Sequence, residues 1–146
     1  MKISVIQMNS QTGKAENIEQ ARKLVADAVA HDRPTMVVLP EVWTMLGGSL
    51  EQRRAAAEEI PGGEAYRALQ DAAKTHKVVV HGGSFYERAP DGYFNTTVAF
   101  GPDGQELARY RKIHLFDVTT PDGREYKESA TVGRGDRVAA ARAWTA

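Results

Sequence analysis

Apolar and polar residues along the first part of the chain follow the spacing of alternating strands and helices. Residues 2–9 alternate with the period of a strand, with Ile3 and Val5 on one face and apolar residues on the other as well. Residues 17–30 repeat apolar positions at helical spacing, and residues 35–39 form a continuous apolar run. A strand, a helix and a second strand predict a right-handed βαβ unit. Since both strands are largely apolar, we expect both faces of their sheet to be covered.

The middle of the chain continues this α/β pattern. Residues 49–59 and 64–75 predict helices on either side of the break Pro61-Gly62-Gly63, and residues 78–80 predict a third buried strand. Two further segments predict a hairpin around a Gly-Pro-Asp-Gly turn, and a second turn of this kind follows them. The hairpin strands are expected at residues 94–100 and 106–112, and the second turn at residues 120–123.

Length and charge narrow the possible functions. The chain of 146 residues fits a single domain, residues 1–146, in which the alanine-rich residues 137–146 form an atypical tail. Nineteen basic and nineteen acidic residues give no net charge that would attract nucleic acid, and no apolar run is long enough for a membrane span. The first ten residues lack the pattern of a secretory signal. We therefore expect a cytoplasmic protein with small-molecule or protein partners, and no nucleic acid or membrane partner.

Glu41 is the first candidate for chemistry. It follows the second predicted strand in the segment TMVVLPEVW, residues 35–43. Ligands usually bind at the carboxyl ends of the strands in open α/β sheets. We expect Pro40 to end the strand pairing and apolar walls to keep the Glu41 carboxylate poorly solvated, as suits a general base. Taken alone, the position is more typical of a helix-capping or solvent-facing glutamate.

Lys112 is the second candidate, in the segment YRKIHLF, residues 110–116. In a strand, Lys112 and His114 would share one face and Arg111 would take the other. A lysine beside a carboxylate stays cationic and can stabilise an oxyanion. The same basic residues would also protect an edge strand. The four histidines of the chain show no metal-ligand spacing, so we predict no metal site.

Two further segments have weaker signals. The sequence His81-Gly82-Gly83-Ser84 could bring backbone amides close to a ligand, or it could form a tight turn. It matches neither the dinucleotide pattern nor the P-loop pattern. Glu128 follows a loop in the segment YKES and, taken alone, is a surface glutamate.

Taken together, these segments resemble the carbon-nitrogen hydrolase family, also called the nitrilase superfamily. The matching motifs follow in order: Gln7, LPE at 39–41, HGGS-x-x-E at 81–87, Asn95-Thr96, YRKIHLFD at 110–117, ES at 128–129 and Gly135-Asp136. The wording YRKIHLFD is most similar to the omega-amidase and deaminated-glutathione amidase branch. The resemblance implies an αββα sandwich, of which these residues would form the N-terminal half with about one sheet and its helices.

The resemblance also implies roles for three residues and a substrate class. Glu41 would be the general base, Lys112 the cation that stabilises the oxyanion, and Glu128 an additional glutamate that positions the substrate or the lysine. In this scheme a cysteine thiolate attacks a small-molecule amide, ammonia leaves from an acyl thioester, and water releases the acid. No cofactor is implied. Proteins of the family commonly form homo-oligomers by pairing sandwiches as dimers.

The sequence departs from the family in its nucleophile. The cysteine should follow soon after Gly135-Asp136, yet the chain contains none. We therefore expect a chain that is truncated before its nucleophile, inactive by the family mechanism and prone to aggregate at an unpaired sheet edge. One alternative is a non-catalytic paralogue or interaction module in which Glu41 and Lys112 form a structural ion pair. Another is a small doubly wound domain that binds an anion at residues 81–84.

Overall fold

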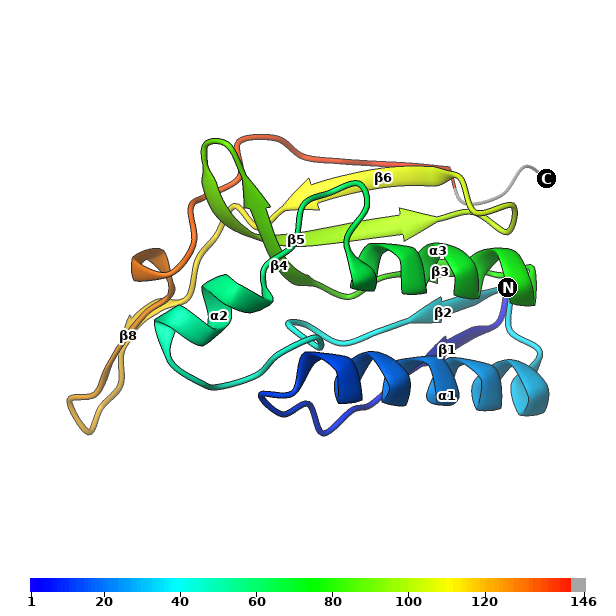
Figure 1. Ribbon diagram of the computed structural model, residues 1–146, viewed down its shortest axis with the longest axis horizontal. Coiled ribbons are helices and arrows are strands. Elements are labelled where there is room, and N and C mark those ends of the chain that lie inside the picture. Colours follow the sequence, from blue (N-terminus) through cyan, green and yellow to red (C-terminus); the bar gives the residue numbers. More distant parts are fainter. Residues whose placement is uncertain (143–146) are drawn as a thin grey trace.

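A six-stranded mixed sheet is covered on one face by two long helices (Figure 1). The computed structural model describes residues 1–142. The sheet consists of β1 (Ile3–Val5), β2 (Met36–Val38), β3 (Val79–His81), β4 (Phe85–Ala89), β5 (Gly92–Phe100) and β6 (Glu106–Arg111). The helices are α1 (Lys14–Asp32), α2 (Leu50–Ala56) and α3 (Glu64–His76). A separate hairpin contains β7 (Asp117–Thr119) and β8 (Glu125–Lys127), and the short 3-10 helix η1 (Glu128–Ala130) follows it.

The strand order brings distant segments of the chain to one end of the sheet. Strands β1, β2 and β3 are parallel, whereas β5 pairs antiparallel with β3, β4 and β6. Because β2 and β6 run toward the same region, the residues that follow them meet there (Figure 1). The predicted α/β class and the helices expected at 17–30 and 64–75 are confirmed. Strand β4 was not predicted, and the turn expected at 120–123 joins the hairpin of β7 and β8.

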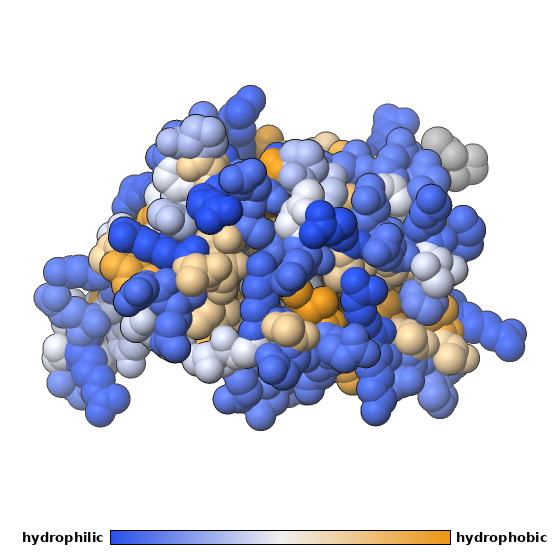
Figure 2. Space-filling view, viewed as in Figure 1, coloured by the Kyte–Doolittle hydropathy of each residue, from blue (hydrophilic) through white to orange (hydrophobic). Residues whose placement is uncertain are grey.

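The hydrophobic core lies between the sheet and the helices α1 and α3. Val37, Val80, Val98 and Phe100 are fully buried on the helix side of the sheet. The surface over α1 and α3 is largely hydrophilic (Figure 2), as expected for amphipathic helices. Within residues 1–142, no helix has both the length and the apolar character needed to span a bilayer.

The expectation that both faces of the sheet are covered is wrong for the described residues. Ile3 and Val5 are 44% and 76% exposed, whereas Ser4 and Ile6, which alternate with them, are buried. The long helices α1 and α3 lie on one face, so the residues that point to the other face have few partners. Residues 137–142 of the predicted tail pass along β6 without regular structure (Figure 1), and residues 143–146 lie outside the described residues.

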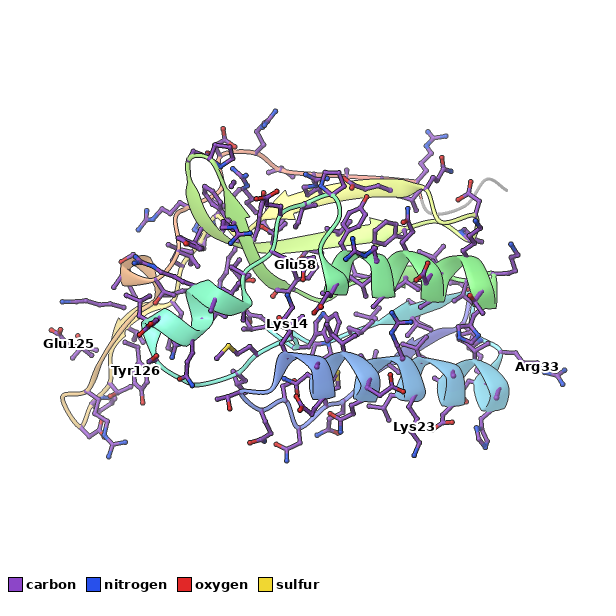
Figure 3. The ribbon with its side chains drawn as sticks, viewed as in Figure 1. Lys14, Lys23, Arg33, Glu58, Glu125 and Tyr126 are labelled. Carbon is purple, nitrogen blue, oxygen red and sulfur yellow. The ribbon has the colours of Figure 1, made fainter. Side chains whose placement is uncertain are left out.

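Glu58 joins α1, α3 and β4, and Figure 3 shows it near Lys14 between the two long helices. Its carboxylate accepts hydrogen bonds from the backbone N–H groups of Ala65 (3.1 Å) and Tyr66 (2.9 Å) at the start of α3. It also pairs with Lys14 Nζ of α1 at 2.6 Å and is 6% exposed. Helix α2 ends at Ala56, short of the predicted residue 59, because the backbone of Glu58 pairs with β4 instead.

We expect the substitution Glu58→Ala to lower the free energy of unfolding by about 3 kcal/mol, because it leaves Lys14 and two N–H groups of α3 without their partner. The measurement is urea denaturation of the chain. The matched control is Glu59→Ala, whose side chain is 76% exposed and whose effect should stay within about 0.5 kcal/mol. Equal losses in the two variants would contradict this role of Glu58.

Candidate active site

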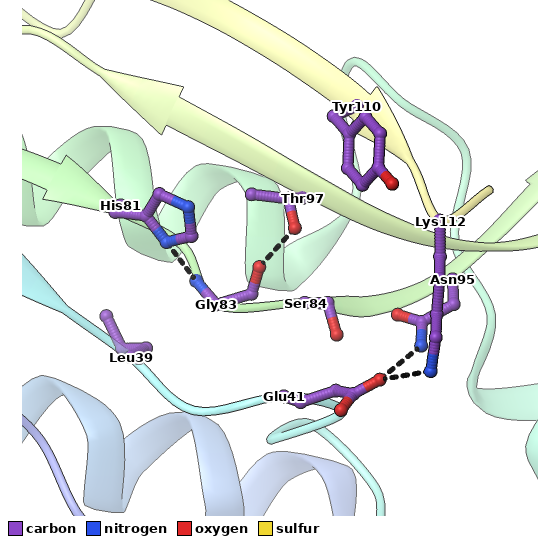
Figure 4. A pocket seen from close by; sticks show the side chains of 9 residues that line it. All are labelled: Leu39, Glu41, His81, Gly83, Ser84, Asn95, Thr97, Tyr110 and Lys112. Carbon is purple, nitrogen blue, oxygen red and sulfur yellow. Dashed lines mark hydrogen bonds and ion pairs between the residues drawn. The ribbon is translucent and has the colours of Figure 1, made fainter. Parts of the chain in front are cut away.

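Three segments far apart in the sequence place charged side chains around one point. Glu41 follows β2, Lys112 follows β6, and Glu128 begins η1. Asn95 projects toward them from β5, and Figure 4 shows it beside Glu41 and Lys112. The structure therefore brings together all three residues for which the sequence predicted a role.

Lys112 lies between two carboxylates. Its Nζ is 2.9 Å from Glu41 Oε1 and 2.9 Å from Glu128 Oε2, and its side chain is 26% exposed. Partial burial lowers the pKa of Lys112, but the hydrogen bonds and charges of Glu41 and Glu128 outweigh it and hold this pKa above its ordinary value. The ammonium is therefore charged at neutral pH.

Glu128 is the better buried of the two carboxylates, with a side chain that is 19% exposed. It accepts hydrogen bonds from the backbone N–H of Phe116 at 2.7 Å and from Asn95 Nδ2 at 3.2 Å. Burial raises the pKa of Glu128, but these donors and Lys112 outweigh burial and hold the pKa below its ordinary value. Glu128 is thus a fixed anion of the site and not the surface glutamate that its local sequence indicated.

The backbone after Pro40 aims Glu41 at Lys112. Val42 adopts a left-handed conformation with φ of 49°, which is unusual for a β-branched residue, and its N–H donates to Ser84 Oγ at 3.0 Å. The Glu41 side chain is nevertheless 61% exposed, so the expectation of a poorly solvated carboxylate is wrong for the described residues. Residues 1–142 leave one side of this carboxylate open.

The glycine-rich segment 81–84 forms a tight turn against this backbone. Its N–H groups are already used: Gly82 donates to Val98 O, Gly83 to His81 Nδ1 and Ser84 to Pro40 O. Gly83 has φ of 56°, and a side chain there would collide with the carbonyl of Pro40. The tight turn is therefore confirmed, and the alternative of an anion cradle at these amides is wrong.

A second ionic cluster lies on the opposite side of the same strands. Arg111 makes two hydrogen bonds to Glu87, at 2.7 and 2.9 Å, and Thr96 Oγ1 donates to Glu87 Oε2 at 2.6 Å. Burial raises the pKa of Glu87, but the bonds from Arg111 and Thr96 hold it below its ordinary value. Arg111 and Lys112 thus point in opposite directions, as the predicted alternation required.

Two details of the predicted segment 110–116 differ in the structure. Strand β6 ends at Arg111, and Lys112 continues the pairing only through its N–H, which donates to Asn95 O at 2.8 Å. His114 is exposed and does not share the site with Lys112. Among the described residues β6 pairs with β5 alone, so it is an edge strand, but Arg111 and Lys112 are held in ion pairs instead of facing solvent.

A cavity of about 300 Å³ opens beside the charged cluster. Figure 4 shows its lining residues, which are Leu39, Glu41, His81, Gly83, Ser84, Asn95, Thr97, Tyr110 and Lys112. Within the described part of the chain, no three His, Asp or Glu side chains are grouped as metal ligands. The arrangement offers an acceptor for a proton, Glu41, beside a fixed cation, Lys112. Asn95 and Glu87 belong to motifs of the sequence, but no local pattern indicates a role for either.

Comparison with known proteins places these features in a family. The sequence matches the carbon-nitrogen hydrolase family over residues 2–144. It is 36% identical over 137 residues to the deaminated glutathione amidase of Synechocystis, a match that covers 92% of this chain and 49% of that protein. It is also 36% identical over 135 residues to an omega-amidase of Homo sapiens, covering 92% of this chain and 48% of that protein. The chain spans about half the length of the curated relatives it matches.

Solved structures agree in fold. Nit3 of Saccharomyces cerevisiae, a member of the nitrilase superfamily, superposes with a TM-score of 0.79 at 25% identity, covering 94% of this chain and 49% of that one. A carbon-nitrogen hydrolase superfamily protein of Xanthomonas campestris superposes with a TM-score of 0.76 at 25% identity, covering 94% and 47%. These matches confirm the predicted resemblance and the nitrilase-type α/β fold. The roles of Glu41, Lys112 and Glu128 stay predictions.

The cluster around Glu87 predicts a pH dependence of stability. The folded pKa of Glu87 lies below its ordinary value of 4.5, so its contribution is present above pH 4.5 and is lost as the pH falls through the folded pKa. We expect Glu87→Gln to lower the free energy of unfolding at pH 7 by about 2 kcal/mol, and this difference from the unsubstituted chain should shrink in acid. The measurement is denaturation at several pH values.

Asp91→Asn is the matched control, since Asp91 contacts the same Arg111 from a side chain that is 65% exposed. Its effect should be below about 1 kcal/mol. If the difference between Glu87→Gln and the unsubstituted chain were constant from pH 7 into acid, ionised Glu87 would not be the stabilising form.

Proposed function

The chain belongs to the carbon-nitrogen hydrolase family, and from this premise we propose that Glu41, Lys112 and Glu128 form the acid–base part of a site that hydrolyses small amides. One observation carries the proposal: Lys112 Nζ lies 2.9 Å from a carboxylate oxygen on each side. A cation held in this way suits an oxyanion, because it is already oriented before charge develops on the substrate.

Each residue has a separate task in the proposed reaction. Glu41 takes the proton of a thiol, and the thiolate attacks the amide carbonyl to form a tetrahedral oxyanion beside Lys112. The carbon–nitrogen bond then breaks, the proton passes from Glu41 to the departing nitrogen, and an acyl thioester remains. Water, losing a proton to Glu41, attacks the thioester and releases the acid and the thiol. Glu128 keeps the Lys112 ammonium charged and in place throughout.

The thiol of this mechanism is not among the 146 residues, which include no cysteine. We propose that these residues alone do not carry out the reaction and that the thiol comes from outside them. Residues 1–146 would then supply the base, the cation and the part of the pocket shown in Figure 4.

The position of Arg53 favours a substrate that carries a carboxylate. It lines a second cavity of about 410 Å³ that extends from Lys112 past Tyr86 and Phe116. Its Nε donates to the carbonyl of Gly47 at 3.1 Å, and Arg53 takes part in none of the ion pairs between residues 1–142. A guanidinium that lines a cavity and makes no ion pair within residues 1–142 can pair with a carboxylate of the substrate. We therefore propose an amide that also carries a carboxylate, of the kind acted on by omega-amidases or deaminated glutathione amidases.

The test is ammonia release from a small carboxylate-bearing amide such as succinamate by the complete gene product that contains residues 1–146. We expect Glu41→Gln and Lys112→Met each to lower kcat at least about a hundredfold, because one removes the base and the other the cation. Glu51→Gln is the control, because Glu51 is an exposed residue of α2 that lines neither cavity, and this variant should keep full activity. The isolated chain of 146 residues should release no ammonia.

Two results would overturn the proposed function. One is a complete gene product without any cysteine. The other is amide hydrolysis that survives both substitutions, which would leave Glu41 and Lys112 as a structural ion pair of a protein whose chemistry lies elsewhere.

A further inference from the structure

Asn95 is hydrogen-bonded to both carboxylates of the candidate site and to the backbone of Lys112. It lies in the middle of β5 and is 2% exposed. Its Nδ2 donates to Glu41 Oε1 at 3.0 Å and to Glu128 Oε1 at 3.2 Å. Its backbone carbonyl accepts the N–H of Lys112 at 2.8 Å. One residue is therefore bonded to both carboxylates and to the backbone of the cation.

The two carboxylates fix the orientation of the Asn95 amide. If the amide were turned over, its oxygen would face two anionic oxygens, so only one orientation is compatible with the site. In that orientation Asn95 Oδ1 is buried without a hydrogen-bond partner among residues 1–142. A buried acceptor without a partner is unfavourable for folding. The amide therefore donates to both carboxylates, while its own oxygen stays without a hydrogen bond within residues 1–142.

The strand around Asn95 prevents it from shifting. Asn95 is paired with Tyr86 of β4 on one side and hydrogen-bonded to Lys112 on the other. Its neighbour Thr96 is fully buried and is bonded through its side chain to Glu87 on the opposite face. Side chains on both faces of β5 thus hold the same short stretch of backbone.

We propose that Asn95 is a positioning residue that holds Glu41 and Glu128 on two sides of the Lys112 ammonium. By occupying Glu41 Oε1 together with Lys112, it leaves Glu41 Oε2, which accepts no hydrogen bond within residues 1–142, to take the proton of the nucleophile. The chemical consequence rests on the proposed function. The arrangement itself does not, because it can be tested in the chain without any reaction.

The test follows the titration of the Glu128 carboxyl and the Lys112 amine by NMR in the chain of residues 1–146. Asn95→Leu removes the donor at similar volume, so we expect the pKa of Glu128 to rise and that of Lys112 to fall as Glu41 turns toward solvent. The nearby charge of Arg53 and the Tyr86 hydroxyl are unchanged in this variant. Asn95→Asp keeps the shape but adds a third carboxylate, and here too the pKa of Glu128 should rise.

Asn17→Leu is the matched control. Asn17 is also buried, at 3% exposure, and its amide is bonded to both backbone groups of Gln11 and to Thr44 O, but not to the side chain of Glu41, Lys112 or Glu128. We expect this variant to lose more thermal stability than Asn95→Leu and to leave the titration of Glu128 and Lys112 in the folded chain unmoved. This contrast separates a role in the site from a role in stability.

In the complete gene product, Asn95→Leu should lower kcat by about a hundredfold, because a small misplacement of the base is enough for such a loss. KM should change much less. Absence of amidase activity in the unsubstituted gene product would refute the proposed function and leave the titration to decide the role of Asn95. Unmoved titrations in both Asn95 variants would overturn the positioning role. Failure of both variants to fold would overturn it as well, since Asn95 would then be a structural residue.

Discussion

The ammonium of Lys112 is the charge around which this end of the sheet is organised. A lysine that is only 26% exposed loses much of its hydration and needs anionic partners. Its two partners do not contribute equally. An ion pair with the 61% exposed Glu41 is worth at most about 1 kcal/mol, because water screens it. Glu128, 19% exposed and bonded to the backbone of Phe116, therefore does most of the anchoring, while Glu41 is held only through Oε1, by Asn95 and Lys112.

The strands β5 and β6 divide their polar side chains between two faces with different tasks. Asn95 and Lys112 point to the candidate site, whereas their neighbours Thr96 and Arg111 point to Glu87. The Glu87 side chain is 4% exposed, and Arg111 also lies 3.7 Å above the ring of Phe94. The buried Glu87 carboxylate accepts hydrogen bonds from Thr96 of β5 and from Arg111 of β6, so it ties the register of β5 to that of β6. A fixed register in turn fixes where Lys112 leaves the sheet.

The sequence could predict what depends on local periodicity and could not predict what depends on long-range contacts. Alternation along residues 106–112 correctly separated Arg111 from Lys112, and the proline after the second strand located Glu41. Nothing local shows that Asn95 bridges Glu41 and Glu128 or that Glu58 pairs with Lys14, because the partners of Asn95 lie 33 or 54 positions away and Lys14 lies on a separate helix, α1. The expectation that both faces of the sheet are covered failed for the same reason. An apolar strand indicates that a face can be buried, but the element that would cover it is not encoded locally.

The unequal burial of the two carboxylates also bears on the proposed reaction. Together with Lys112 they carry one net negative charge, and a proton arriving at Glu41 would make the cluster neutral. If Glu41 were the only anion beside Lys112, that proton would leave the ammonium without a partner and lower its pKa at the step where an oxyanion needs it charged. Glu128 prevents this, because its bonds to Phe116, Asn95 and Lys112 keep its own pKa low. In the proposed reaction, the second carboxylate is therefore what allows the first to change its charge without disturbing the cation.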